Sequence, residues 1–207
     1  MLVSLNELNT NDFFDYCIIG AGPAGITLAI KLAEKNKKIL LVEGGGTDIS
    51  YESQSLYEGD VVGDDYLSLD TCRLRYFGGT SNHWSGVCRT FDEIDFVGRN
   101  DFNLYKWPIE KSDIDRYLIE ASDILEINNI KPDIKINNWD IKKIYFEKSP
   151  PVRFKDKYLD KIKNSKNIFL TLNTNCINFE TNGKFITNVV LKNKLQKKIK
   201  SNSFILA

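Results

Sequence analysis

Residues 20–25 read Gly-Ala-Gly-Pro-Ala-Gly, which is the spacing G-x-G-x-x-G. In this pattern the first glycine permits a tight turn, the second lets the backbone approach a pyrophosphate, and the third lets a helix pack closely. The first turn of that helix offers unpaired N–H groups and a partial positive charge to an anion. The pattern therefore predicts that the motif binds a phosphate group through Gly20, Gly22, Pro23, Ala24 and Gly25.

An acidic residue follows the glycine motif at the spacing typical of dinucleotide sites. Glu43 lies 23 positions after Gly20, and the acid that binds the ribose hydroxyls is expected about 20 positions on. Gly44 comes next, and we expect it beside the same ligand. A glycine turn with a purely structural role is the alternative. The complete pattern favours dinucleotide binding.

Two buried strands and a helix are predicted to position these residues. Residues 14–19 are mostly aromatic and β-branched, as in a strand buried on both faces of a parallel sheet. Apolar residues recur at helical spacing from Ile26 to Ala33, and residues 39–42 form a second apolar run. The strand, turn, helix and second strand form a βαβ unit.

Apolar periodicity and turn residues predict the rest of the chain. In order, we expect an irregular segment at 47–72, a helix at 112–127, an excursion from the core at 128–151, a short helix at 154–162, and a meander of strands at 168–172, 176–180, 185–191 and 198–206. The helix at 112–127 would carry Ile114, Leu118, Ala121 and Leu125 on one face. A hairpin turn is predicted at 181–183.

The composition is that of a globular protein. The 207 residues are 42% hydrophobic and 27% charged, which excludes a disordered tail or a repeat fibre. The 28 basic and 28 acidic residues balance, although residues 1–100 hold 8 basic and 15 acidic residues and residues 101–207 hold 20 and 13. The later lysines are scattered among acidic and apolar residues, so a solvated surface is favoured over a nucleic-acid groove. We expect no nucleic-acid partner.

Cysteine and histidine usage argues against a structural metal. The four cysteines form no Cys-x-x-Cys pair and His83 is the single histidine, so no zinc site is expected. Residues 1–10 lack the features of a signal peptide, which favours a cytoplasmic protein with reduced thiols. The most apolar window, 17–33, is shorter than the ~20 residues of a membrane span and contains Lys31, so no transmembrane segment is expected.

Residues 14–46, FDYCIIGAGPAGITLAIKLAEKNKKILLVEGGG, resemble the N-terminal signature of FAD-dependent oxidoreductases. In that signature the dinucleotide motif lies near the start of the chain, an alanine such as Ala29 follows the last glycine by four positions, and a glutamate ends the second strand. The resemblance implies FAD as the cofactor.

A second glycine-rich element, RLRYFGGTSNHWSGVCR at residues 73–89, resembles the flavin-contacting stretch of the glucose-methanol-choline (GMC) oxidoreductase family. The pyranose-oxidase and gluconate-dehydrogenase-like branch is the most similar, because there a double glycine precedes a small polar run and a His-Trp pair. The resemblance extends over residues 14–207.

The family resemblance implies roles for this second element. Gly78 and Gly79 would let main chain lie against the isoalloxazine ring. Hydrogen-bond donors to the polar edge of the ring would come from Thr80, Ser81 and Asn82. Arg73 and Arg75 would either pair with the pyrophosphate or anchor the loop. Cys176 lies where the family places a short strand whose backbone brackets the adenine.

His83 aligns with a histidine that, in some relatives, bonds covalently to the flavin 8α carbon. A neutral imidazole nitrogen has a lone pair available for such a bond. In other relatives the flavin is not covalently bound, and His83 and Trp84 would then only pack beside it. We keep both alternatives, FAD bound covalently through His83 and FAD bound reversibly.

The sequence therefore predicts an α/β, FAD/NAD(P)-binding Rossmann-like three-layer fold with an added β-meander, incomplete at its C-terminus. Residues 1–12 would be a flexible lead-in and residues 13–207 the FAD-binding domain, as the N-terminal part of a longer enzyme. The resemblance implies an FAD-dependent oxidoreductase that converts a sugar or other alcohol to a carbonyl compound by hydride transfer. The expected catalytic base, a histidine paired with histidine or asparagine, would lie beyond Ala207. An NAD-binding dehydrogenase domain and a non-catalytic nucleotide-binding module are the alternatives.

Overall fold

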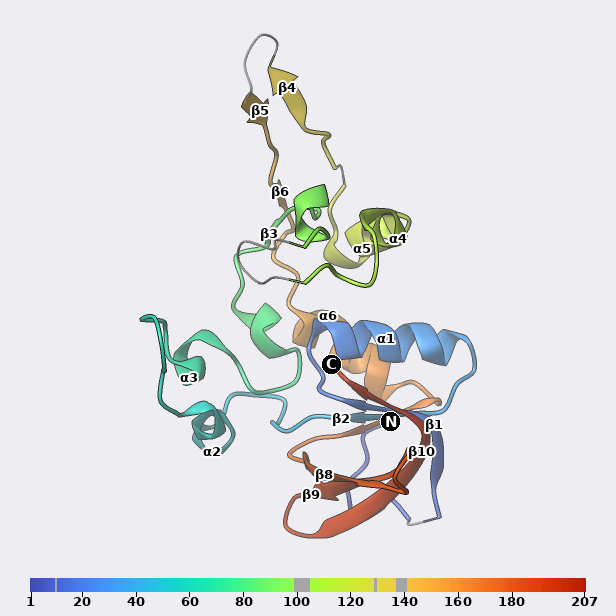
Figure 1. Ribbon diagram of the computed structural model, residues 1–207. Helices are drawn as coiled ribbons and strands as arrows, with labels where there is room; N and C mark the ends of the chain where they lie inside the picture. Colours follow the sequence, from blue (N-terminus) through green and yellow to red (C-terminus); the bar gives the residue numbers. More distant parts are fainter. Residues whose placement is uncertain (10, 99–104, 129, 137–140) are drawn as a thin grey trace. The chain divides into compact units, whose positions relative to one another are not determined.

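The computed structural model describes residues 1–9, 11–98, 105–128, 130–136 and 141–207 (Figure 1). The chain divides into two compact units. Unit 1 comprises Met1–His83 and Arg153–Ala207, and unit 2 comprises Trp84–Val152. The sequence predicts one FAD-binding domain over residues 13–207; within that range the chain leaves unit 1 after His83 and returns to it at Arg153.

Unit 1 contains most of the regular secondary structure. Its elements are β1 (Phe13–Ile19), α1 (Pro23–Glu34), β2 (Ile39–Val42), α2 (Tyr51–Gln54), the 3-10 helix η1 (Ser55–Tyr57), α3 (Leu69–Cys72), the 3-10 helix η2 (Gly79–Asn82), α6 (Phe154–Lys163), β7 (Ile168–Thr171), β8 (Asn175–Thr181), β9 (Ile186–Lys192) and β10 (Gln196–Leu206).

One mixed sheet organises unit 1. Its strand order is β7-β2-β1-β10-β9-β8, in which β7, β2, β1 and β10 are parallel and β9 and β8 are antiparallel. Ile18 on β1 pairs with Leu41 on β2 and with Ile205 on β10. Ile18 and Leu41 are fully buried, as the apolar runs predicted for a sheet covered on both faces.

The parallel part of this sheet lies between two layers. Helices α1 and α6 cover one side of the parallel strands, and β8 and β9 lie on the other side (Figure 1). Strand β10 joins the layers, because Gln196–Ile199 pair with β9 and the later residues pair with β1. The predicted three-layer α/β fold with an added meander is confirmed.

The N-terminal segment is packed, unlike the flexible lead-in that the sequence predicted. Leu5 is fully buried and Leu8 nearly so, in the core cluster that also contains Phe14 and Val189. The Val3 N–H donates to the Leu170 carbonyl at 2.8 Å. The polar composition of residues 1–12 gave no signal that Leu5 and Leu8 would fill the space between the sheet and the meander.

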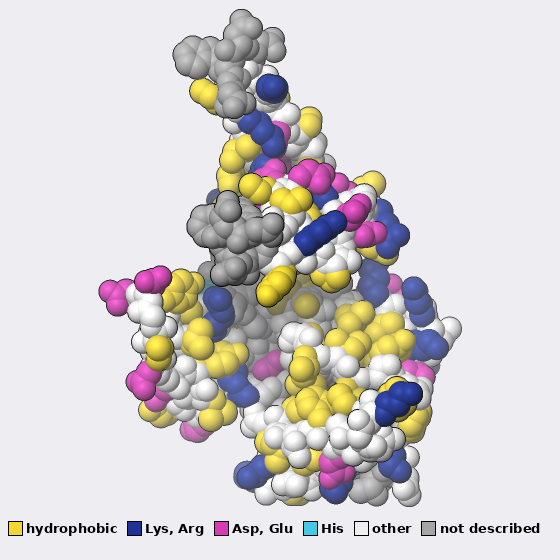
Figure 2. Space-filling model, in the orientation of Figure 1, with side chains coloured by type: hydrophobic (Ala, Val, Ile, Leu, Met, Phe, Trp, Pro, Cys, Tyr) yellow, Lys and Arg dark blue, Asp and Glu magenta, His cyan; other side chains and the backbone are white. Residues whose placement is uncertain are grey.

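Residues 47–72 form an arm that carries α2, η1 and α3 and is closed at its base by Gln54. The Gln54 Nε2 donates to the Asp70 carbonyl at 2.7 Å, and the Arg75 N–H donates to Gln54 Oε1 at 3.1 Å. Hydrophobic and acidic side chains alternate over the arm, on the left of Figure 2. The segment predicted as irregular therefore holds short helices fixed by side-chain hydrogen bonds.

Unit 2 is built from short elements. They are β3 (Val87–Cys88), the 3-10 helix η3 (Glu93–Asp95), α4 (Lys111–Asp115), α5 (Leu118–Leu125), β4 (Ile134–Ile136), β5 (Ile141–Lys143) and β6 (Glu147–Lys148). Strand β3 pairs with β6, and β4 pairs with β5. The single helix predicted at 112–127 is two helices, because the backbone leaves helical geometry at Tyr117, with φ −103° and ψ 2°.

None of the helices in the described ranges combines the length and apolar character that crossing a bilayer requires.

Candidate functional site

The turn between β1 and α1 needs glycine at two positions. Gly20 has φ +105°, and a Cβ there would lie 2.3 Å from the carbonyl oxygen of Ala207. A Cβ at Gly25 would lie 2.0 Å from the carbonyl oxygen of Gly20. Both contacts are with backbone atoms that have no freedom to move away, so α1 can pack this closely on the turn only because both residues lack side chains.

The N-terminus of α1 is open. Gly22 is the extended N-cap residue, no side chain caps the helix, and Pro23 occupies its first turn together with Ala24. The first N–H groups of a helix have no partner within it, and no acidic residue lies in this turn. A Cβ at Gly22 would meet no atom within 4 Å. The turn thus presents unpaired N–H groups at an uncovered surface, which suits an anion.

The second glycine element lies directly on this turn. The Gly78 N–H donates to the Ala21 carbonyl at 2.8 Å. Gly78 and Gly79 both have positive φ, +95° and +55°, and a Cβ at Gly79 would lie 3.3 Å from the Gly22 Cα. The fold therefore brings together two glycine-rich segments that are far apart in the sequence.

Glu43 holds the turn in place. Its side chain is only 7% exposed; Oε2 accepts the Ala21 N–H at 2.9 Å and Oε1 accepts the Gly45 N–H at 2.8 Å. The sequence assigned this acid to ribose binding and missed its structural role. Each carboxylate oxygen can accept a further hydrogen bond, so the two roles are compatible.

A cavity of about 500 Å³ opens beside Glu43. It lies at the carboxyl ends of β1 and β2, where open α/β sheets bind ligands. Its walls include Gly20, Glu43, Gly44, Tyr57, Arg75, Thr174, Asn175, Cys176 and Ala207. The cavity joins the predicted residues Gly20, Glu43, Gly44 and Cys176 in one place.

Arg75 is the most informative cavity residue whose role the sequence left open. Its Nη1 donates to Ser53 Oγ at 2.9 Å, and its Nη2 donates to Asn175 Oδ1. A Cβ at Gly44 would lie 2.2 Å from Arg75 Nη2, so Gly44 makes room for the guanidinium group. The run of three glycines after Glu43 was the available signal that another segment packs here.

The small polar residues of the second element bind their own loop. Ser81 Oγ donates to the Gly78 carbonyl at 2.7 Å, which uses its only proton. Asn82 Nδ2 donates to the Phe77 carbonyl at 2.9 Å and keeps a second N–H. Thr80 Oγ1 accepts the Leu74 N–H at 3.3 Å and keeps its O–H. Of the three predicted donors to a flavin, Thr80 and Asn82 retain a free proton and Ser81 does not.

His83 directly follows the 3-10 helix η2 and is exposed. Among the described residues it has no side-chain hydrogen-bond partner. Trp84 donates from Nε1 to the Val152 carbonyl at 2.9 Å. Cys176 lies on β8 at the cavity wall, where partial burial raises the pKa of its thiol. No group of His, Cys, Asp and Glu in the described ranges is arranged to hold a metal ion.

Comparisons with known proteins agree with this geometry. Residues 14–65 match the family model described as pyridine nucleotide-disulphide oxidoreductase. Over 94% of the chain, the fold is similar to pyridoxine 4-oxidase from Mesorbium loti, with 15% identity and a TM-score of 0.51. Over 96%, it is similar to formate oxidase, with 19% identity and a TM-score of 0.52, and to a variant of Aspergillus oryzae formate oxidase studied for FAD modification, with 20% identity and a TM-score of 0.51.

The chain spans about half the length of these solved structures, 49% of pyridoxine 4-oxidase and 46% of each formate oxidase. At such identities the likeness establishes the fold. It agrees with the predicted Rossmann-like three-layer fold.

Proposed function

We propose that this chain is the FAD-binding portion of a GMC-type oxidoreductase, of the pyranose-oxidase and gluconate-dehydrogenase-like branch, that oxidises the CH–OH group of a sugar or another alcohol. The packing of Gly79 on Gly22, above the open N-terminus of α1, carries the proposal. Here two glycine-rich segments border the helix N-terminus that suits an anion. A dinucleotide bound by main-chain groups requires such close access to the backbone.

The residues present fit FAD. The pyrophosphate would bind the N–H groups of the first turn of α1, which begins at Gly22. The adenosine would occupy the cavity beside Glu43 and Gly44, with β8 at its wall. The isoalloxazine ring would extend toward the segment from Gly78 to His83, where Thr80 and Asn82 have donors that make no hydrogen bond to a described residue.

FAD, when bound, supplies the acceptor for the hydride that leaves the substrate carbon. The chain's own contribution is binding and orientation. Glu43 fixes the β1–α1 turn through Ala21, and Arg75 fixes the cavity wall through Ser53 and Asn175. Such preformed contacts lower the entropy cost of holding a large cofactor in one position.

The sheet supports FAD over the NAD alternative. An NAD-binding dehydrogenase domain would continue as successive parallel strands joined by helices. Here β8 and β9 are antiparallel, and β10 returns beside β1 as the fourth parallel strand. A non-catalytic nucleotide-binding module would share this topology, so the experiment must also test redox competence.

The test is to purify the chain, record its visible spectrum and identify any nucleotide released on denaturation by chromatography. We expect equimolar FAD from the chain, which would be inactive alone because the expected base lies beyond Ala207. Bleaching of the flavin spectrum by an aldose or primary alcohol, added without oxygen, is expected of the full-length protein that supplies this base. Release of NAD would support the dehydrogenase alternative. FAD that no alcohol or sugar reduces in the full-length protein would support the non-catalytic module, and a chain that binds no nucleotide would contradict the proposal.

A further inference from the structure

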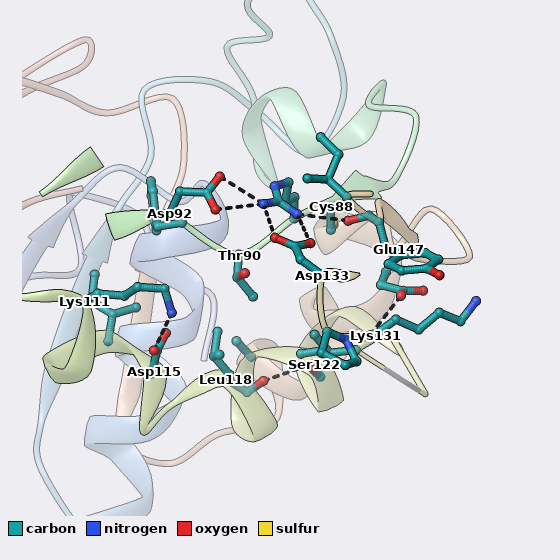
Figure 3. Close-up of a pocket in the computed structure, with 18 of the residues that line it drawn as sticks. Cys88, Thr90, Asp92, Lys111, Asp115, Leu118, Ser122, Lys131, Asp133 and Glu147 are labelled. Atoms are coloured by element: carbon teal, nitrogen blue, oxygen red, sulfur yellow. Dashed lines mark hydrogen bonds and ion pairs between the residues drawn. The ribbon is translucent and has the colours of Figure 1, made fainter. Parts of the chain in front are cut away.

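Unit 2 contains a second and larger cavity, of about 860 Å³, whose walls come only from residues between Cys88 and Glu147 (Figure 3). One wall is the face of α4 and α5 that bears Ile114, Leu118 and Leu125. Ile94 and Ile144 contribute to the lining from other parts of unit 2. The volume lies within the range of about 300–1,000 Å³ that is typical of small-molecule sites.

The helices in this wall present an apolar face to the cavity. Neither α4 nor α5 contains a buried residue. Ile114, Leu118, Ala121 and Leu125 lie on one face, as their helical spacing predicts, and all four line the cavity. Apolar surface left in water costs about 25 cal/mol per Å², so an apolar occupant would stabilise this wall.

The polar part of the wall is internally paired. Arg89 forms a two-point ion pair with Asp133, with both N–O distances 2.9 Å, and a further pair with Asp92 at 2.8 Å. Asp92 and Asp133 point toward the same guanidinium group (Figure 3). Lys142 Nζ lies 2.7 Å from Asp133, and Lys111 pairs with Asp115.

These pairs constrain both the shape and the ligand. They tie together residues near β3, η3, β4 and β5, so the walls are held apart before a ligand arrives. Three of the lining cations, Arg89, Lys111 and Lys142, already contact carboxylates. The fourth, Lys131, has its Nζ over the Tyr145 ring, 5.6 Å from the ring centroid. An anionic ligand would have to compete with these partners, and any charged ligand would lose hydration beside the apolar wall.

We propose that this cavity binds an uncharged, largely apolar small molecule, such as one with a fused aromatic ring system or a branched hydrocarbon body. Two walls and a paired polar rim define a preformed concave site, unlike the flat face that a second protein surface would need. The site lies wholly within unit 2, so this inference does not depend on FAD binding to unit 1.

The test uses N-phenyl-1-naphthylamine, an uncharged apolar fluorophore, titrated into the purified 207-residue chain. We expect saturable fluorescence enhancement. Ala121→Trp, which fills the cavity from α5, should weaken binding by about tenfold or more. Ile119→Trp is the matched control, because Ile119 lies on the same helix, is 78% exposed and does not line the cavity; its affinity should be unchanged.

Leu118→Gln provides a second test should Ala121→Trp fail to fold, since it places an amide in the apolar wall without adding bulk. Circular dichroism checks the fold of each variant. Equal probe binding by the wild type and all variants would overturn the proposal, as would absence of binding. Sedimentation tests for a wild-type dimer that persists in the presence of the probe and is lost in Ala121→Trp. Such a dimer would assign the cavity to a second copy of the chain, and this outcome would also overturn the proposal. Unchanged FAD content in every variant separates this result from the proposed function.

Discussion

The main chain of Gly79 lies against that of Gly22, so closely that a Cβ on Gly79 would be 3.3 Å from the Gly22 Cα. A Cβ on Gly22 itself would meet no protein atom within 4 Å. Gly22 therefore has space around its own Cβ position and yet is a glycine. The protein's own packing does not demand this, and a ligand that approaches the backbone explains it.

Gly22→Val tests this explanation directly. The side chain would fit the protein but would project from the N-cap position into the space assigned to the pyrophosphate. We expect loss of bound FAD with little change in the free energy of unfolding, because no protein atom is displaced. Flavin content and urea unfolding of the same preparation measure both quantities.

Gly59→Val is the matched control for Gly22→Val. A Cβ at Gly59 also meets nothing within 4 Å, and Gly59 lies in the arm, away from the cavity lining. Normal flavin content is expected in this control. Normal flavin content in Gly22→Val as well would contradict the assignment of the phosphate site.

Glu43→Gln should destabilise unit 1 and weaken FAD binding. An amide can accept only one of the two N–H bonds that Glu43 receives from Ala21 and Gly45, and its NH₂ group would face the other donor. Leaving a buried donor unpaired costs about 1–3 kcal/mol. Thermal unfolding and FAD titration measure the two effects.

Glu34→Gln serves as the control for Glu43→Gln, since Glu34 forms an exposed ion pair with Lys161, a kind of contact worth about 0–1 kcal/mol. A Glu43→Gln variant as stable as the Glu34→Gln variant would show that the buried carboxylate does not hold the turn.

Local patterns predicted the parts of the site that depend on short sequence distances. The G-x-G-x-x-G spacing located the turn, the start of α1 and the constraint on Gly25, because these arise within one βαβ unit. The contact that restricts Gly20 comes instead from Ala207, the residue after β10. The strand meander was also readable, since β8 to β10 are sequential and joined by short turns.

Long-range packing was not readable in the same way. Ser81 and Asn82 also have partners that the sequence did not predict: Ser81 Oγ accepts the Phe154 N–H and Asn82 Oδ1 accepts the Lys155 N–H, from a helix more than 70 positions later. Likewise, the apolar residues from Ile114 to Leu125 keep a regular helical spacing in the sequence, although the helix is broken between α4 and α5. Neither contact partners nor helix breaks of this kind leave a local signal.

Arg75→Lys should weaken FAD binding although it keeps the charge. Lysine has one ammonium group and cannot reproduce the planar fork that reaches both Ser53 and Asn175. The cavity wall would loosen, and we expect affinity for FAD to fall by about tenfold. Arg73→Lys, at an exposed position outside the cavity, is the control. Equal affinity for FAD in the two variants would show that Arg75 contributes to binding no more than an exposed charge does.

The ion pairs of unit 2 predict a pH-dependent stability. Hydrogen bonds from Arg89, and then from Lys142, lower the pKa of Asp133, and a hydrogen bond from Arg89 is the main reason that the pKa of Asp92 is also lowered. Since the folded pKa lies below the unfolded value of about 3.9, this stabilisation is complete above that value and is lost as the pH falls through the folded pKa.

Asp133→Asn should therefore lower the urea midpoint of unit 2 at neutral pH, and the difference from the wild type should shrink as the pH drops below about 4. Tryptophan fluorescence isolates this unit, because Trp84, Trp107 and Trp139 all belong to residues 84–152. A difference that is independent of pH would mean that Asp133 acts through packing and not through charge.

His83 provides the most demanding prediction, because the imidazole is exposed and makes no side-chain hydrogen bond with any described residue. Its ring nitrogen is therefore available to bond the flavin 8α carbon. That reaction removes one proton from the 8α methyl group and one from the imidazole, and leaves the flavin reduced by two electrons until dioxygen reoxidises it. In the full-length protein we expect flavin to remain on the wild-type polypeptide after acid precipitation and to be released from His83→Ala.

The exposed neighbour Ser85 provides the control, because Ser85→Ala alters the same loop without removing the imidazole. Its flavin should stay attached. Complete release of flavin from the wild type by acid would reject the covalent bond and leave reversible binding. An unchanged flavin spectrum and unchanged affinity in His83→Ala would then also reject a position of His83 beside the ring, whereas a shifted spectrum would retain that position without the bond.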